Sequence, residues 1–373
     1  MRATRRKAPR HSHGARRAPR VATMLAATLG LASVLGWGFL SGCAHDAADD
    51  ANATGAETAR DELVTTTDAA SNAEASANEQ LPFAVEDADL DSIPSDAALV
   101  TFSLTRDDAG ADSTAFDLSS DARASLEAAL AAMTVEVDCD ASIVFIDVQS
   151  GDGIAYNADY AVYGASAYKA PYALYVCESQ LETGRASLSS YCTWEGTSGT
   201  VQSMAEQAVL VSDNESFFAL RAAFDKATYG DWVESLGATD ELAIDPMSDF
   251  PIYSARTAAK LWREMLLYLD SGSEYATWLG GLLQNTSISY IRGGVQGAAL
   301  QAGMGEGVTV YNKAGWIAEG PGYESTSDAA IIRTADGSTY LMCIMSDQAY
   351  SDASAQRVAN MAAALFNVRE ELA

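Results

Sequence analysis

Three short groups of residues could together supply a serine nucleophile, its base and a set of substrate-binding groups. Ser166 and Lys169 lie three residues apart in a stretch with helical periodicity, which places both side chains on one face of a helix. A serine hydroxyl needs a base before it can attack a carbonyl, and a partly buried lysine with a lowered pKa can serve. The other groups are Ser212-Asp213-Asn214, at the start of a helical stretch, and Lys313-Ala314-Gly315, at the end of a strand pattern.

Each group alone has a plainer interpretation. Ser166 could cap a helix beside a surface lysine, Ser212-Asp213-Asn214 could be an ordinary N-cap, and Lys313 could end a strand before a turn. Together, in this order and in these structural contexts, they form a much more specific pattern. The pattern indicates an acyl-transfer enzyme with a lysine base.

The composition excludes the commoner hydrolase mechanisms. No histidine follows His45, so the folded part of the chain has neither a Ser-His-Asp nor a Cys-His catalytic group, and no histidine zinc ligand. The base must therefore be Lys, Asp, Glu or Tyr. The lysines after residue 43 are Lys169, Lys226, Lys260 and Lys313, and two of these four belong to the groups above. We expect no metal and no cofactor.

The elements that must position these groups are strands and helices in separate blocks. The periodicity predicts helices over 119–133, 167–180, 254–270 and 353–372, and strands over 142–148, 308–311, 329–334 and 339–345. Gly151-Asp152-Gly153 forms a hairpin turn that leads from the first strand into a second. From there to Gly237 the periodicity is mostly helical. This order predicts an α+β fold, in which helices flank an antiparallel sheet and a helical subdomain lies between strands.

From about Ser119 to Ala373, the chain resembles the class A β-lactamase-type serine hydrolases. Gly153–Asn157 and Ala165–Pro171 are similar to the second strand and active-site helix of that family, and Thr200–Asn214 to the helix before its Ser-Asp-Asn loop. The resemblance implies a β-lactamase/transpeptidase-like fold over residues 98–373. It also implies that Ser166 is the acylated nucleophile and Lys169 its base.

The remaining roles follow from the same resemblance. Ser212 would relay a proton to the leaving nitrogen, and Asn214 would hold the substrate amide. Lys313 would supply positive charge near Ser212 and the substrate carboxylate, with Ala314 and Gly315 beside it on the substrate-binding strand. The backbone N–H groups of Ser166 and Trp316 would form the oxyanion hole.

Two positions depart from the family pattern. The family has Thr or Ser where this chain has Ala314, and that hydroxyl binds the substrate carboxylate; Arg292 is the candidate to replace it. The Glu-x-x-Leu-Asn loop, whose Glu activates the deacylating water, is also missing. Glu241, Asp245 and Asp249 are the possible substitutes, although the plainer interpretation of each, a solvated loop carboxylate or a cap, is the favoured one.

Three functions remain open at this point. The leading hypothesis is hydrolysis of a β-lactam through an acyl-serine intermediate. The same groups would suit a D,D-peptidase-like enzyme acting on a D-Ala-type cell-wall peptide, which needs no deacylating Glu. A surface-binding module that keeps the fold without catalysis is the third.

The first 42 residues have the layout of an export signal. They hold eight basic residues and no acidic one, followed by an apolar stretch over 21–40. Leu40-Ser41-Gly42-Cys43 resembles a bacterial lipobox, which implies a lipid on Cys43 after cleavage. An uncleaved transmembrane anchor is the alternative, since about 20 apolar residues can span a bilayer. Either way, we expect an extracytoplasmic protein held at the cell membrane.

Residues 43–97 are rich in Ala, Asp, Glu, Thr and Ser, which predicts a disordered acidic tether. After residue 42, 15 basic residues stand against 51 acidic ones, a net charge of −36. Such a surface repels nucleic acid, so we expect no nucleic-acid partner. The family resemblance implies a small-molecule β-lactam or cell-wall peptide substrate, and we expect a monomer.

Four cysteines remain after Cys43. In an oxidising compartment they could pair, and Cys177 with Cys192 is the preferred pair because the two flank the turn signal Thr183-Gly184. Free buried thiols are nearly as favoured. The four, Cys139, Cys177, Cys192 and Cys343, allow three possible pairings in all.

Replacement of Cys43 tests the lipid anchor. Cys43→Ala removes the only thiol that the lipobox offers for acylation, so the variant should leave the membrane fraction or accumulate unprocessed. The measurement is membrane fractionation with gel migration of parent and variant. A variant that fractionates and migrates like the parent would contradict the lipobox interpretation.

Overall fold

The computed structural model describes residues 83–104, 116–136, 139–242, 249–305 and 307–372. The predicted signal peptide, Cys43, most of the tether and Asp245 lie outside the described residues. No helix in the described part of the chain is both long and apolar enough to cross a membrane.

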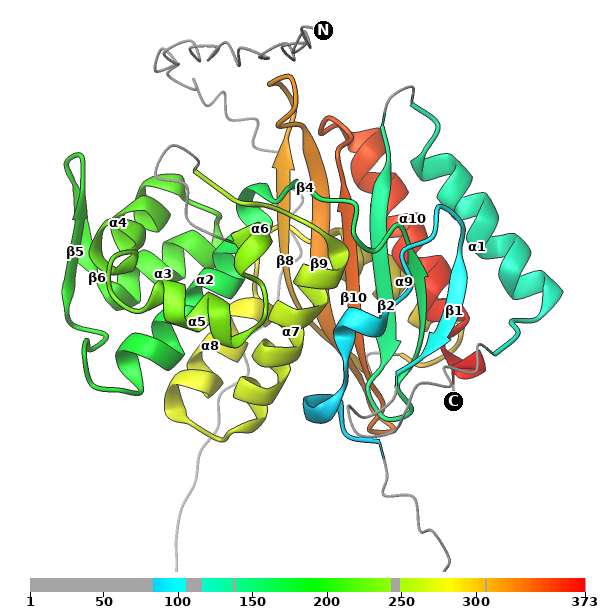
Figure 1. Cartoon of the computed structure of the whole chain (residues 1–373), viewed down its shortest axis with the longest axis horizontal. Helices are drawn as coiled ribbons and strands as arrows, with labels where there is room; N and C mark the ends of the chain where they lie inside the picture. The colour runs from blue at the N-terminus through cyan, green and yellow to red at the C-terminus, as the bar shows by residue number, and fades with distance from the viewer. Residues whose placement is uncertain (1–82, 105–115, 137–138, 243–248, 306, 373) are drawn as a thin grey trace, which may run out of the picture. The chain divides into compact units, whose positions relative to one another are not determined.

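A six-stranded antiparallel sheet forms the centre of the domain (Figure 1). Across the sheet the strands are β1 Val100–Ser103, β3 Asp152–Tyr156, β2 Ala141–Asp147, β10 Thr339–Ser346, β9 Ser325–Thr334 and β8 Val308–Ile317. β2 pairs with β3, β8 with β9 and β9 with β10, while β1 pairs with β3 at one edge of the sheet. β10 pairs with β2 and so joins the two halves of the chain.

Helices cover both faces of this sheet. One face carries α1 Ser120–Met133, α9 Tyr290–Gln301 and α10 Asp352–Asn367. The other carries α2 Lys169–Val176 and α7 Ala255–Asp270, together with a helical subdomain of α3 Val201–Leu210, α4 Asn214–Phe224, α5 Tyr229–Ser235, α6 Thr239–Leu242 and α8 Glu274–Gln284. The predicted α+β fold, with a helical subdomain between strands, is confirmed.

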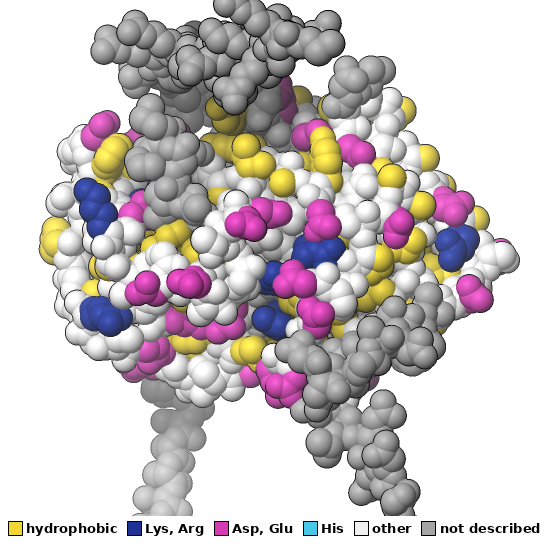
Figure 2. Space-filling model, viewed as in Figure 1, with side chains coloured by type: hydrophobic (Ala, Val, Ile, Leu, Met, Phe, Trp, Pro, Cys, Tyr) yellow, Lys and Arg dark blue, Asp and Glu magenta, His cyan; other side chains and the backbone are white. Residues whose placement is uncertain are grey.

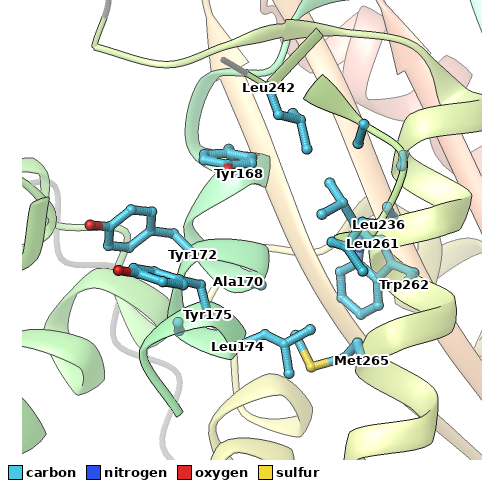
Figure 3. Packing of buried hydrophobic residues seen from close by; sticks show 14 of the residues in the cluster. Tyr168, Ala170, Tyr172, Leu174, Tyr175, Leu236, Leu242, Leu261, Trp262 and Met265 are labelled. Atoms are coloured by element: carbon cyan, nitrogen blue, oxygen red, sulfur yellow. The ribbon is translucent and has the colours of Figure 1, made fainter. Parts of the chain in front are cut away.

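Two hydrophobic cores lie back to back across the sheet. All seven residues of β2 are buried, because alternate side chains enter opposite cores: Val144 packs toward α2 and α7, and Phe145 toward the face of α1 and α10. In Figure 3, Leu174 of α2 and Met265 of α7 point into the first of these cores. Acidic side chains are spread over the outside of the face seen in Figure 2.

The predicted helix starts are confirmed at their caps. The Ser119 hydroxyl accepts from the Ala122 N–H at the start of α1, and Ser254 caps α7 in the same way. The predicted helix over 167–180 is a continuous run of three types: a 3₁₀ turn over Ala165–Tyr168, α2, and a π turn over Cys177–Leu181.

Some strands were missed or shortened in the sequence analysis. A small hairpin of β5 Tyr191–Trp194 and β6 Thr197–Thr200 interrupts the block expected to be helical. β4 Val162–Tyr163 pairs with β7 Ile252–Tyr253 beside the active-site helix. β8 continues past the predicted end at residue 311 to Ile317, and β9 begins at Ser325 with four buried polar residues that gave no apolar signal.

Residues 83–97, which the sequence analysis assigned to the tether, are described by the structure. Within the expected tether, Val85, Leu90 and Ile93 are buried against the core. Arg256 of α7 donates to the carbonyl oxygens of Leu90, Asp91 and Ile93 at 2.5–2.8 Å, and Arg263 donates to that of Ala88. The average composition of residues 43–97 concealed these few apolar side chains.

The preferred disulfide is not formed. Cys177 and Cys192 are separate buried thiols, which is the alternative that the sequence left open. Burial in apolar surroundings raises the pKa of the Cys192 thiol to about 11, so it stays protonated and unreactive.

Gly315 allows β8 to lie directly against the 3₁₀ turn that carries Ser166. A Cβ atom at Gly315 would be 2.4 Å from the Ala167 nitrogen and 2.6 Å from the Gly164 carbonyl oxygen. Both are backbone atoms, which cannot rotate away. The spacing between this strand and the turn therefore depends on a residue without a side chain.

Gly315→Ala should lower the free energy of unfolding by about 1–3 kcal/mol through this overlap. The control is Gly281→Ala, at an exposed position of α8, where an added Cβ has no atom within 4 Å. That change should stabilise the helix by about 0.5–1 kcal/mol. Urea unfolding of both variants measures the difference, and equal stabilities would contradict the close approach.

Candidate active site

Ser166 is the one side chain between residues 162 and 177 that is partly exposed; all the others are buried. It lies in the 3₁₀ turn before α2, where the amino-terminal end of the helical run favours developing negative charge. The preceding Ala165 has a φ of 46°, in the left-handed region that L residues rarely adopt. The fold thus exposes a single hydroxyl on an otherwise buried turn.

Lys169 is buried one turn later and is held by neutral oxygen atoms. Its Nζ donates to the carbonyl oxygen of Ser212 at 2.5 Å and to Oδ1 of Asn214 at 2.6 Å, and lies 3.5 Å from the Ser212 hydroxyl. Burial, reinforced by the charge of Lys313, lowers the pKa of Lys169 to about 6. Above that pH the amine is neutral and can accept a proton.

Ser212 brings the second group to Lys169 through an unusual backbone conformation. Its φ is 64°, and the next residue, Asp213, caps α4 by accepting from the Ser216 N–H at 2.7 Å. The tight turn directs the Ser212 carbonyl toward Lys169, while its hydroxyl accepts from Nζ of Lys313 at 3.1 Å. The Ser212 hydroxyl therefore lies between the two amines.

Lys313 reaches the site from β8 and is 2% exposed. Its Nζ also donates to the carbonyl oxygen of Ala314 at 2.6 Å. Burial lowers the pKa of Lys313 to about 7, partly opposed by the attraction of Asp328. Two amines with lowered pKa values thus flank one serine hydroxyl, an arrangement suited to passing a proton between them.

Arg292 does not reach this site. Its guanidinium donates to the carbonyl oxygens of Leu283 and Thr286, to the Thr286 hydroxyl, and to Oδ1 of Asn312 at 2.7 Å. Asn312 in turn donates to buried Asp328, which also accepts from two N–H groups at the start of α9. All of these partners are residues of the domain itself, on α8, on the segment after it and on β8. The expectation that Arg292 replaces a contact to the substrate carboxylate is therefore wrong.

The Ala314 side chain also points away from the site. It is fully buried in the core on the α9 and α10 face, since alternate residues of β8 face opposite sides of the sheet. Gly315 and Lys313 share the other face, next to the Ser166 turn. Ala314 can therefore contribute only backbone atoms to a bound substrate.

Aromatic rings surround the two amines, and sequence reasoning missed most of them. Nζ of Lys169 is 5.6 Å from the Phe250 ring, and Nζ of Lys313 is 5.7 Å from the Trp316 ring. Beyond Phe250 the contacts continue to Tyr163 and Tyr323, and beyond Trp316 to Tyr350. These residues lie on separate segments without a motif, so no local spacing could identify them.

The candidate carboxylates for deacylation are used elsewhere or lie at the surface. Glu241 accepts from the N–H and hydroxyl of Ser254, at 2.8 and 3.1 Å, and so supports the start of α7. Asp249 is exposed, and its carbonyl oxygen accepts from Arg221. Among the described residues, no group of His, Cys, Asp and Glu side chains is arranged to hold a metal ion.

Several solved structures with this fold align with this chain over nearly their whole length. PBP-A matches with a TM-score of 0.55 and 16% identity over 67% of this chain and 97% of its own. A β-lactamase from Chitinophaga pinensis matches with a TM-score of 0.54 and 17% identity, over 67% of this chain and 99% of its own. A β-lactamase from Sphaerobacter thermophilus matches with a TM-score of 0.52 and 17% identity, over 65% of this chain and 95% of its own. At these identities the likeness concerns the fold. A variant of PBP-A has been solved as an acyl-enzyme complex with penicillin G.

The comparison with curated proteins found no match. The model of the β-lactamase enzyme family matches residues 125–368, which include Ser166, Lys169, Ser212, Asn214 and Lys313. That span is well over half of the chain. The protein therefore belongs to the β-lactamase enzyme family, a family of serine hydrolases.

Proposed function

We propose that this domain is an acyl-serine hydrolase in which Ser166 attacks an amide carbonyl, of a β-lactam or of a D-Ala-type cell-wall peptide. The observation that carries the proposal is the buried Lys169 amine, which is held by two neutral oxygens one helical turn after Ser166. Held in this way and with its pKa lowered to about 6, the amine is available as a base at neutral pH.

Each of these groups has a part in the acylation step. Lys169 takes the proton of the Ser166 hydroxyl as its oxygen bonds to the substrate carbonyl carbon. The N–H groups of Ser166 and Trp316 donate to the oxygen that becomes negative. Collapse of this intermediate breaks the carbon–nitrogen bond, and the leaving nitrogen takes a proton from Ser212, which Lys313 and Lys169 can replenish.

Asn214 has a second part in this scheme. Its Oδ1 accepts from Lys169, which fixes the orientation of the amide and leaves its NH₂ group to donate elsewhere. We propose that this NH₂ group binds the amide carbonyl of the substrate side chain. Asn214 would thus position both the base and the substrate.

The site favours acylation over deacylation. Release of the acyl group needs a second base aimed at a water molecule, and Glu241 is instead bound to Ser254. This observation favours the D,D-peptidase-like or penicillin-binding alternative over an efficient β-lactam-degrading enzyme. The complete set of Ser166, Lys169, Ser212 and Lys313 argues against a binding module without catalysis.

The cellular setting remains a proposal from the sequence. A lipid on Cys43 would hold the enzyme on the outer side of the cell membrane, where cell-wall peptides and β-lactams are encountered. The acidic residues up to 82 would then link that anchor to the domain.

Lys169→Ala should abolish acylation about as completely as Ser166→Ala, because nucleophile and base act as one unit. We expect a loss of about 10²–10⁴-fold for removal of the base. In the parent, the acylation rate should rise with pH through about 6, where Lys169 loses its proton, and level off above. Intact mass after incubation with a fluorescent penicillin measures both.

Lys226→Ala is the matched control, since Lys226 is an exposed lysine at the end of α4. It should label like the parent. A Lys169→Ala protein that is acylated at near-parental rate would show that another residue is the base, and failure of the parent to label at all would favour the binding module.

Turnover of a chromogenic cephalosporin should show a stoichiometric burst followed by slow hydrolysis. The burst reports formation of the acyl-enzyme, and the slow phase reports deacylation without a second base, since Glu241 is bonded to Ser254. Stopped-flow absorbance with mass spectra at intervals distinguishes the two phases. Sustained hydrolysis at many turnovers per second would contradict the expectation, and Glu241→Gln and Asp249→Asn would then identify the base.

A further inference from the structure

Two phenylalanine rings lie against the Lys169 amine, in addition to the oxygen atoms that bind it. Nζ of Lys169 is 5.8 Å from the centre of the Phe217 ring and 5.6 Å from that of Phe250. The two rings stack on each other, with their centres 5.0 Å apart and an angle of 5° between their planes. Lys169 and Phe217 are each 1% exposed, and Phe250 is 6% exposed. The amine therefore ends against an apolar wall, which we call the Phe217–Phe250 wall.

The two rings of this wall come from different parts of the chain. Phe217 belongs to α4, whereas Phe250 lies on the segment before β7. The Phe250 backbone N–H donates to the hydroxyl of Tyr163, and the Tyr163 ring meets the Phe250 ring edge-on at 6.0 Å. The carbonyl oxygen of Asp249 accepts from Arg221 at 2.7 Å. Contacts to α4 and β4 thus fix the Phe250 ring beside the amine.

The wall acts on the protonation of Lys169 in two opposed ways. The face of an aromatic ring attracts a cation, which favours the charged amine. Exclusion of water disfavours the charged amine. The pKa of Lys169 is lowered to about 6, and burial is the largest cause, so exclusion of water outweighs the attraction of the rings.

Charged and titratable side chains near the amine or the wall come from several elements. They are Lys313 from β8, Asp213, Arg221 and Asp225 from the start and end of α4, Tyr172 from α2, Tyr163 from β4 and Asp249 from the segment before β7. Lys313 disfavours the charged form of Lys169, and Asp213 favours it. The charge of Arg221 is compensated by Asp225 at 2.9 Å. A substitution of Phe250 leaves all of these groups in the chain.

We propose that Phe250 is a positioning residue of the reaction: its ring, stacked on its neighbour in the wall, excludes water from the Lys169 amine and keeps that amine uncharged. The inference rests on the proposed acyl-serine function and deepens it. Phe250 acts through Lys169 and not on the substrate. The proton that the uncharged amine accepts is that of the Ser166 hydroxyl, and the bonds that form and break are those already described.

Two substitutions of similar size test whether the apolar character of Phe250 matters. Phe250→Gln places a polar amide beside the amine, whereas Phe250→Met fills the same space with an apolar chain. In the parent, the acylation rate should rise with pH with a midpoint near 6. In the Gln variant the midpoint should be higher by about one pH unit or more, because the amide and the water it admits stabilise the charged amine. In the Met variant it should stay within about half a pH unit of the parent.

The rates themselves follow from the neutral fraction of the amine. For a midpoint one pH unit higher, the Gln variant should be acylated about fivefold more slowly than the parent at pH 6. At pH 9 the amine is neutral in both proteins, so the two rates should agree within about twofold. The measurement is the intact mass of the full chain after incubation with a fluorescent penicillin between pH 5 and 9, with circular dichroism to verify folding.

Phe116→Gln is the matched control. Phe116 is a half-buried phenylalanine that packs against the core on the other face of the sheet, so this change should leave the midpoint at the parental value. If Phe250→Gln does not fold, Phe250→Ala takes its place, and the same upward shift is expected.

Two results would overturn the inference while leaving the acyl-serine function in place. One is a rate that falls by the same factor at every pH in the Gln variant, which is the effect of a merely structural role. The other is a common midpoint for the Gln and Met variants. A parent that is not acylated at any pH would overturn the proposed function itself, and the inference with it.

Discussion

The chemistry of this site depends on a lysine that is buried without a carboxylate bonded to it. Lys169 donates to a backbone carbonyl and to a side-chain amide, both of which bind the amine without favouring its charged form as strongly as an anion would. A pKa lowered from 10.5 to about 6 corresponds to roughly 6 kcal/mol in favour of the neutral amine. The positive φ of Ser212 and the Asp213 cap of α4 place these two oxygens where the amine ends, and the Phe217 and Phe250 rings lie beside the amine.

The structural features that sequence analysis predicted correctly are those set by local geometry. Three residues on a helix place Ser166 and Lys169 on one face whatever surrounds them, and a capping residue such as Asp213 marks the start of α4 by its own hydrogen bond. The fold class followed from the separation of strand and helix patterns in the same way. These features need no knowledge of distant parts of the chain.

The predictions were wrong where the position of a side chain depends on sheet register or on contacts between distant elements. They were also wrong where the average composition of a segment hid a few apolar residues. The strand pattern ended at residue 311 and so assigned no face of the sheet to the residues from Lys313 to Gly315. The strand β8 in fact runs to Ile317 and sends Ala314 and Lys313 to opposite faces. The Arg292 side chain donates to Asn312 of β8, and the spacing of residues along the sequence does not reveal a contact between two separate elements. The acidic composition of residues 43–97 similarly hid the buried side chains of Leu90 and Ile93.

The junction between tether and domain has a mechanical consequence. Arg256 and Arg263 hold the carbonyl groups of residues 88–93 along α7, ahead of the edge strand β1. With the proposed lipid anchor at Cys43, tension along the chain would reach these bonds before it reached β1. β1, whose bonds to β3 would otherwise be peeled apart one after another, is thereby shielded, and with it the sheet that holds Lys313 against the nucleophile.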